Sequence, residues 1–241
     1  MTRGESNMKQ QKLLQSGKVK SVYKTDIPGQ LIIEFRDDIS AFDGGKKDVL
    51  MDKGRYNAEV SAFFFRYLED HGVKTHFVKM LDEKRMVVRD LQMIPLEVIV
   101  RNFAAGSLVR NYPFKEGTPL SPPIIVIDYK DDSRHDPMLN DEIIGALGLA
   151  TLAELKKIKK IALEVNSHLS GFLAELDITL VDFKLEFGRG GKTIYVGDEI
   201  SMDSMRLWDK TTGESLDKDV YRFDKGDVMA TNTKVSRRIC T

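Results

Sequence analysis

The sequence has very little cysteine, because Cys240, beside the carboxyl end, is the only one in 241 residues. An internal disulfide is therefore excluded, and the pattern is typical of a reducing compartment, so we expect a cytoplasmic protein. Long hydrophobic runs are also missing, since no stretch approaches the ~20 apolar residues of a membrane helix. The first residues, MTRGESNMKQQ, are polar and lack the apolar segment of a secretory signal.

A net charge is absent as well. The chain has 37 lysines and arginines and 37 aspartates and glutamates. This balance argues against general binding of nucleic acid or of a membrane surface. The composition, 41% hydrophobic and 31% charged, is that of a globular protein with a buried core. We therefore expect small-molecule partners, with no nucleic acid and no membrane.

The first part of the chain predicts strands around one helix. KVKSVYKT and QLIIEFRDD alternate and are separated by a Pro-Gly turn, and THFVKML, RMVVRDLQM and LEVIVRNFA follow later. Between them, NAEVSAFFFRYLEDHG has helical apolar spacing and ends at Gly72. This organisation predicts a strand-rich amino-terminal lobe.

The second part is mixed. The clearest helix begins at Thr151, which forms a predicted capping box with Glu154. Residues 113–123 hold four of the seven prolines and predict an ordered loop or extended connection. Residues 210–241 show weak periodicity. The border between the two lobes lies near residues 91–95, and clefts between such lobes are common ligand sites.

Two segments could bind anions. In SGKVKSVYK, Gly17 precedes Lys18 and Lys20, which share one strand face and could meet a polyphosphate. The more ordinary interpretation is a hairpin turn with solvated lysines. In VIVRNFAAGSLVR, Arg101 and Ser107 flank a small-residue turn, which suits an anionic group as well as it suits a plain strand exit.

YKDDSRHDP is a weaker signal. The His135–Asp136 pair suggests a general base or a metal ligand, but a turn explains it equally well. In DSMRLWD, Asp203 precedes Arg206, which could contact a ligand phosphate or form a structural ion pair.

VDFKLEFGRGGKTIYVGDEI carries the strongest signal. Asp182, Lys184 and Glu186 share one strand face, and Asp198 and Glu199 appear where the return strand ends. Carboxylates without a cysteine or histidine cluster suit Mg²⁺, which takes one or two carboxylates and substrate phosphates. A tight turn at RGG would place Asp198 opposite Asp182, and a bulge or wider loop would change that register. Spacing alone leaves the metal pair open.

Taken together and in order, the motifs resemble the SAICAR synthetase family over nearly the whole chain. The matching segments are SGKVKSVY, IPLEVIVRNFAAGSL, HDPML, VDFKLEFG, GDEISMDSMRLWD and SLDKDVYR. The resemblance implies a two-lobed α+β fold, kinase-like or ATP-grasp-like, with ATP in the cleft. Residues 1–94 would form the antiparallel-sheet lobe, and residues 95–241 the mixed lobe with the metal and CAIR sites.

The family resemblance also implies an activity. It predicts an ATP-dependent amide ligase of de novo purine biosynthesis, acting with Mg²⁺. The enzyme would join CAIR, 5-amino-1-(5-phosphoribosyl)imidazole-4-carboxylate, to L-aspartate through an acyl phosphate, giving SAICAR, ADP and phosphate. A homodimer or another homo-oligomer is implied. A small-molecule kinase and a nucleotide-binding regulatory module are the alternatives.

The resemblance assigns residues as well. Glu186 and Asp198 would hold the metal and act in catalysis with Lys184. The positions implied for ATP are Lys18, Lys20, Lys130 and the backbone of Met93. Those implied for substrate are Asp43, Arg101, Ser107, Asp136, Asp203, Arg206 and Arg222. Met202 departs from the family, which usually has proline there, so we expect a more relaxed loop.

Overall fold

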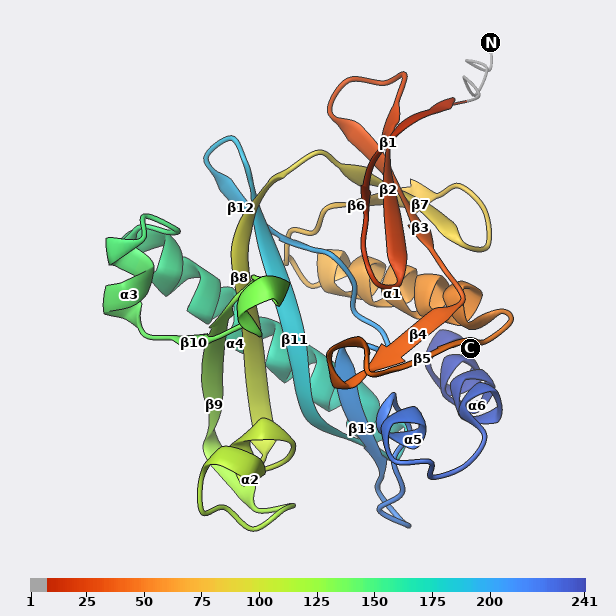
Figure 1. Cartoon of the computed structure of the whole chain (residues 1–241), viewed down its shortest axis with the longest axis vertical. Coiled ribbons are helices and arrows are strands. Elements are labelled where there is room, and N and C mark those ends of the chain that lie inside the picture. Colours follow the sequence, from red (N-terminus) through yellow and green to blue (C-terminus); the bar gives the residue numbers. More distant parts are fainter. Residues whose placement is uncertain (1–7) are drawn as a thin grey trace.

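The computed structural model describes residues 8–241, except for the side chain of Asp43. Within this part, helices pack against two main antiparallel sheets, a third sheet consists of two short strands, and Figure 1 shows the smaller main sheet above the larger one. This confirms the predicted α+β class. The side chain of Asp43, expected to bind substrate, lies outside the described part of the structure, so its assignment stays a prediction.

The smaller sheet lies in the amino-terminal part, and its strands follow the order β1-β2-β3-β7-β6. Helix α1 (Lys53–Asp70) packs on this sheet, where the buried Phe65 stacks on Phe77, whereas the neighbouring Phe64 contacts Phe172 in the later part of the chain. These contacts explain the helical spacing of the aromatic run. The strands are β1 (Gln10–Ser16), β2 (Lys20–Thr25), β3 (Gln30–Phe35), β6 (Phe77–Met80) and β7 (Arg85–Arg89).

The larger sheet is formed by the strands β8 to β13. Its strands follow the order β10-β9-β8-β11-β12, and β13 pairs with the remaining part of β11. The strands are β8 (Gln92–Phe103), β9 (Pro119–Tyr129), β10 (Met138–Leu139), β11 (Ile178–Gly190), β12 (Thr193–Gly197) and β13 (Met205–Asp209).

Helix α4 (Leu152–Glu175) covers one face of this sheet (Figure 1). The predicted capping box is confirmed, because the Glu154 amide donates to Thr151 Oγ1 at 3.2 Å and Glu154 Oε2 accepts from the Thr151 amide at 2.8 Å. On β11, Val181, Phe183 and Leu185 are buried in the core. The polar side chains of β11 therefore lie on the face away from α4.

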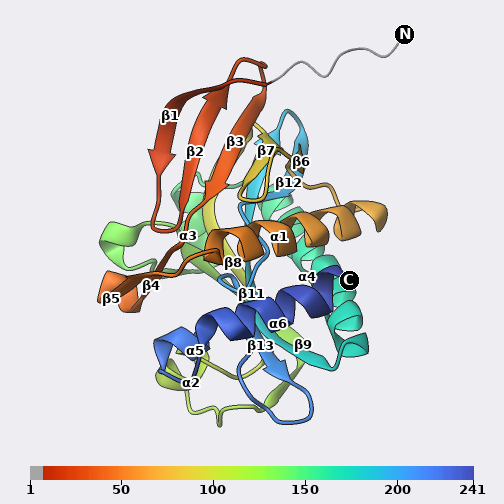
Figure 2. The same ribbon diagram turned by 90° about the vertical axis from the view of Figure 1, so that its right-hand side faces the viewer.

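The carboxyl-terminal part contains helices that the weak periodicity did not predict. Helix α6 (Val228–Cys240) lies beside α1, as Figure 2 shows, and buries Val235 and Ile239. The proline-rich segment is likewise only partly a connection, since Pro119 begins β9. The remaining elements are β4 (Asp38–Ala41), η1 (Phe42–Gly44), β5 (Lys46–Val49), α2 (Ser107–Asn111), η2 (Asp132–Arg134), α3 (Asp141–Ala146) and α5 (Asp219–Arg222).

The expected border between the lobes falls inside β8. Ile94 and Leu96, on either side of it, are buried in one core cluster that draws on both sheets. The division after residue 94 therefore stays a prediction. In the part of the chain that the structure describes, no helix is both long and apolar enough to cross a membrane.

Candidate active site

A cleft of about 590 Å³ lies between the smaller sheet and the polar face of the larger one. It is the place where most of the residues predicted from the sequence come together. They are Lys18, Lys20, Met93, Lys130, Asp136, Lys184, Glu186, Asp198, Asp203 and Arg222.

The β11–β12 hairpin sets the position of the two predicted metal ligands. Gly190 pairs with Thr193, so the turn lies at residues 191–192 and Glu186 faces Gly197. The register that follows from a tight turn at RGG, with Asp198 opposite Asp182, is therefore wrong. Asp198 instead directly follows the residue opposite Glu186, and its φ of 60° turns the chain out of β12. Both carboxylates thus reach the cleft.

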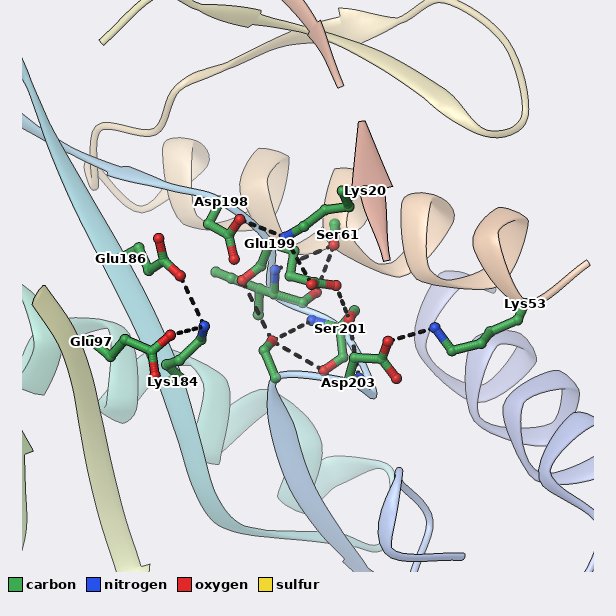
Figure 3. A network of polar contacts seen from close by, with 12 residues as sticks. Lys20, Lys53, Ser61, Glu97, Lys184, Glu186, Asp198, Glu199, Ser201 and Asp203 are labelled. Carbon is green, nitrogen blue, oxygen red and sulfur yellow. Dashed lines mark hydrogen bonds and ion pairs between the residues drawn. The ribbon is translucent and has the colours of Figure 1, made fainter. Parts of the chain in front are cut away.

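Three lysines surround these carboxylates. Lys20 Nζ, from β2, donates to Asp198 Oδ1 at 2.5 Å and to Glu199 Oε1 at 2.8 Å. Lys184 Nζ donates to Glu186 Oε1 at 2.8 Å and to Glu97 at 2.6 Å, as Figure 3 shows. Lys130 Nζ donates to the second oxygen of Glu186.

These contacts fix the charge states. Burial alone would lower the pKa of Lys20, but Asp198 and Glu199 outweigh it and raise that pKa above its ordinary value. Burial alone would raise the pKa of Asp198, but Lys20 and Lys184 lower that pKa well below its usual range. Lys20 is therefore protonated and Asp198 ionised at neutral pH, an arrangement that can receive both phosphate oxygens and a cation.

Glu186 and Asp198 fit a magnesium ion only when other ligands join them. Among the described residues, no group of three or more histidine, cysteine, aspartate or glutamate side chains could hold a metal by itself. Mg²⁺ often takes only one or two carboxylates and completes its octahedron with phosphate oxygens and water. The pair therefore suits a metal that arrives with a nucleotide.

One part of the cleft is apolar. Val22, Ile33 and Val88 line it from the smaller sheet, and Met93 lines it from β8. A Cβ on Gly188 of β11 would come within 3.0 Å of Met93 Sδ. Glycine at this position therefore gives the Met93 side chain of β8 the space to line the cleft. A flat aromatic ring could be buried there, beside backbone groups of β8.

His76 lines the same cleft and was not predicted from the sequence. Its side chain is 3% exposed, and Nε2 has no hydrogen-bond partner among the described side chains. Burial lowers the pKa of His76 to about 4, so the ring is neutral.

The other end of the cleft is cationic. Asp203 Oδ2 accepts from Lys53 Nζ at 2.5 Å, and Arg222 Nη1 donates to Asp219 at 2.5 Å. Lys218 also lines the cleft, and its ammonium group has no hydrogen bond or ion pair among the described side chains. Burial lowers the pKa of Lys218. A partly buried, unpaired ammonium group favours an anionic ligand.

Arg101, Ser107 and Arg206 lie outside the residues that line the cleft. Arg101 donates to Asp182 at 2.8 Å and to Ser107 Oγ at 2.8 Å. Arg206 donates to Asp182 at 2.7 Å and to Asp219 at 2.7 Å. This is the structural ion pair that the sequence offered as one of two interpretations of Arg206. The substrate-binding roles of the three residues stay predictions.

The loop around Met202 is well braced. Met202 is 1% exposed and belongs to the core. The Ser201 amide donates to Ser204 Oγ at 2.9 Å, and Ser201 Oγ donates to Glu199 Oε2 at 2.5 Å. These hydrogen bonds and the buried methionine support the turn, and the expected relaxation on loss of proline stays a prediction.

Sequence patterns missed several residues of the site, namely Lys53, His76, Glu97 and Lys218. Glu97 carried a usable signal, because it alternates with the buried residues of β8 and so shares a face with Ile99 and Arg101. Lys53 and Lys218 gave none, since single lysines in polar segments are normally solvated.

Comparisons with known proteins agree on one family. The SAICAR synthetase family model matches residues 13–239. The phosphoribosylaminoimidazole-succinocarboxamide synthases of Methanoregula boonei and Methanoculleus marisnigri are 78% and 67% identical to the chain. Both alignments cover 96% of the chain, and they cover 91% and 96% of those proteins. A solved structure described as SAICAR synthetase (Type-2) in complex with ADP matches with a TM-score of 0.92 at 48% identity. That match covers 95% of this chain and 97% of the other.

Proposed function

The chain belongs to the SAICAR synthetase family, and we propose that its cleft joins CAIR to L-aspartate with ATP. The enzyme is an ATP-dependent ligase of purine biosynthesis, and its products are SAICAR, ADP and phosphate. The roles of individual residues, the metal and the two acceptor substrates form the rest of the proposal.

One observation carries the proposal. Glu186 and Asp198 lie in one cleft with Lys20, Lys130 and Lys184, from strands of both sheets and the loop after β9. Transfer of a phosphoryl group needs such positioned charges more than it needs a covalent nucleophile on the protein. Triphosphate oxygens would replace the two carboxylates as acceptors for the lysines, and Glu186 and Asp198 would then hold Mg²⁺.

The nucleotide would lie along the cleft. We assign the adenine to the apolar part beside Met93, where the backbone of β8 can donate and accept hydrogen bonds. Lys18 and Lys20 would contact the phosphates, and Lys130 would leave Glu186 to join them. Mg²⁺, when bound, would neutralise charge on the phosphates during transfer.

The chemistry has two steps. The CAIR carboxylate attacks the γ-phosphorus of ATP, so an acyl phosphate forms and ADP leaves. The aspartate amine then attacks the acyl carbon, the C–N bond forms, the C–O bond to phosphate breaks, and the amine loses a proton. We assign Lys184 to the stabilisation of the reacting carboxylate, and the position of its protonated Nζ between Glu97 and Glu186 supports this role.

The anionic groups of the substrates suit the cationic end of the cleft. Arg222 and the unpaired Lys218 can meet a phosphate or a carboxylate directly. Arg101 and Arg206 would reach the CAIR phosphate by turning away from Asp182, and Ser107 by leaving Arg101. Asp203 is proposed to accept hydrogen bonds from substrate, and Asp43 and Asp136 are retained as further acidic positions of the site.

A homo-oligomer, most simply a dimer, is proposed on the family resemblance, together with a cytoplasmic location. Exposed apolar side chains, Met138, Leu147 and Leu152, offer surface for a second copy. Light scattering on the purified protein gives the mass, and a monomer at micromolar concentration would contradict the proposal.

The decisive test is an assay that varies the substrates. Purified protein receives ATP, Mg²⁺, CAIR and aspartate, and we expect SAICAR by mass spectrometry with one ADP per amide. Omission of aspartate should abolish sustained ADP release. A phosphorylated acceptor as final product would favour a small-molecule kinase, and ADP binding without any turnover would favour a regulatory module.

A further inference from the structure

Lys53 is a buried lysine that the proposed chemistry does not use. It is the first residue of α1 and is 0% exposed. Lysine is almost never fully buried unless it is paired, because its charge loses the solvation of water. Its partner is Asp203, on the loop that joins β12 to β13, and Figure 3 shows the two side chains extended toward each other.

The backbone around Lys53 is fixed to the segments that follow β3 and β5. The Gly54 amide donates to Asp37 Oδ1 at 3.0 Å, and the Lys53 amide donates to Leu50 O at 3.0 Å. A Cβ on Gly54 would come within 2.3 Å of Phe35 O, so the start of α1 lies directly against the end of β3. The ammonium group of Lys53 thus extends from a rigid base to the loop.

Asp203 is held from two sides and keeps one oxygen available. Its amide donates to Ser201 Oγ at 3.1 Å, and Lys53 takes Oδ2. No described residue donates to Oδ1, although Asp203 lines the cleft. A carboxylate fixed through one oxygen can accept a hydrogen bond from a ligand through the other.

We propose that Lys53 is a positioning residue for substrate recognition, which fixes Asp203 so that its free oxygen accepts a hydrogen bond from a hydroxyl or amino group of a substrate. The inference rests on the proposed function. CAIR, with its ribose hydroxyls and amine, and aspartate, with its ammonium group, both offer such donors. In the proposed function, the phosphates of ATP would lie at the other carboxylate pair, Glu186 and Asp198.

The charges around Asp203 support this role. Lys53 faces it from α1, Lys218 from the residue that precedes α5, and Arg222 from α5. Burial would raise the pKa of Asp203, but these cations, Lys53 foremost, lower it to about 2. Asp203 therefore stays an acceptor throughout the working pH range, and loss of Lys53 would weaken that state.

The experiment compares Lys53→Met, Asp203→Asn and the double variant with the wild type. We expect Lys53→Met to raise KM for CAIR or for aspartate by about tenfold or more, the loss of one hydrogen bond to a charged group. KM for ATP and the affinity for ADP should change by less than about twofold. Whichever of the two acceptor substrates is affected identifies the donor.

Two further readouts separate positioning from a merely structural role. The double variant should have the same KM values as Asp203→Asn, because Lys53 acts through Asp203. It also leaves no buried unpaired charge, so it remains informative if Lys53→Met fails to fold. In Lys53→Met the pKa of Asp203 should rise, so kcat/KM for the affected substrate should fall at acidic pH where the wild type is flat.

Lys159→Met is the matched control. It removes the Lys159–Asp141 pair, 2.6 Å long, between α4 and α3 and outside the cleft, and should leave every KM unchanged. An equal rise of all KM values in Lys53→Met, unchanged kinetics, or a double variant much worse than Asp203→Asn would overturn the inference. Failure of the proposed function is distinct, because the wild type itself would then form no SAICAR.

Discussion

Lys20 Nζ and Asp198 Oδ1 lie 2.5 Å apart, although they come from different sheets and are 178 positions apart in sequence. The contact joins β2 of the smaller sheet to the end of β12 in the larger one. Both groups are largely buried, so each holds the other in its charged form. The pair shows that the cleft depends on both sheets. When nucleotide phosphates and a metal ion bind, they would have to separate Lys20 from Asp198.

The first prediction concerns Asp198. Asp198→Asn should keep the fold, because Glu199 still pairs with Lys20. It should lower kcat by roughly two orders of magnitude, because a neutral amide is a poor ligand for Mg²⁺. Turnover is measured over a range of Mg²⁺ concentrations, with Asp141→Asn on α3 as the control outside the cleft. Near-normal rates at ordinary Mg²⁺ would contradict the assignment.

This site also shows what the sequence could supply. Strand alternation places Asp182, Lys184 and Glu186 on one face, and the structure bears this out. The register of the hairpin was not readable, because Gly190, Gly191 and Lys192 allow more than one turn, and one residue of slip exchanges the faces. The position of Asp198 therefore came from the family resemblance rather than from spacing.

Contacts between distant segments were beyond the sequence for a different reason. Lys53 and Asp203 are 150 positions apart, and nothing local distinguishes Lys53 from a solvated lysine. Helix α6 could not be predicted for the same reason. It is stabilised by packing on α1, and its own sequence shows only weak periodicity. Local patterns predict elements well, while pairings across the cleft depend on the tertiary fold.

A second prediction concerns Arg206. Arg206→Ala should raise KM for CAIR by about tenfold and KM for ATP much less, because the guanidinium shares Asp219 with Arg222 of the cleft and does not contact the lysines around Glu186. Asp182 keeps its ion pair with Arg101, which limits the damage to the fold. Steady-state kinetics with each substrate varied in turn provide the measurement. A larger rise in KM for ATP than in KM for CAIR would contradict the assignment of Arg206 to CAIR.

Lys218 allows a third prediction. Lys218→Met should raise KM for CAIR or aspartate by roughly tenfold, because an unpaired ammonium group in the cleft is lost. Stability should stay the same or rise slightly, since no ion pair is broken and a partly buried charge is removed. Kinetics and urea unfolding test both parts. Lys225→Met, on the exposed segment after α5, is the control, and equal KM values for the two variants would disprove the assignment.

A fourth prediction uses pH. Burial, with Asp219 close by, raises the pKa of Asp217 to about 7 from an ordinary 3.8. The folded state thus holds this proton more tightly than the unfolded state, so this residue makes the protein less stable as pH rises from about 4 to 7. The loss is on the order of 2–4 kcal/mol. Other carboxylates act in the opposite direction, so the comparison must be made against a variant.

The measurement for Asp217 is urea unfolding of the wild type and Asp217→Asn between pH 4 and 8. The free energy of unfolding of the wild type, relative to that of the variant, should decrease as pH rises. Asparagine also loses one of the two amide contacts, from Leu207 and Asp219, which lowers stability at every pH but adds no slope. Parallel curves would show that Asp217 does not titrate in this range.

The fifth prediction tests the rigid base of α1. Gly54→Ala should destabilise the protein by about 1–3 kcal/mol, because the added Cβ would lie 2.3 Å from Phe35 O and backbone must shift to admit it. Gly171→Ala is the control near the carboxyl end of α4, where a Cβ meets no atom within 4 Å. That variant should gain roughly 0.5–1 kcal/mol, because alanine favours helix over glycine. If Lys53 is placed by this contact, Gly54→Ala should also raise the KM that Lys53→Met raises, whereas Gly171→Ala should not.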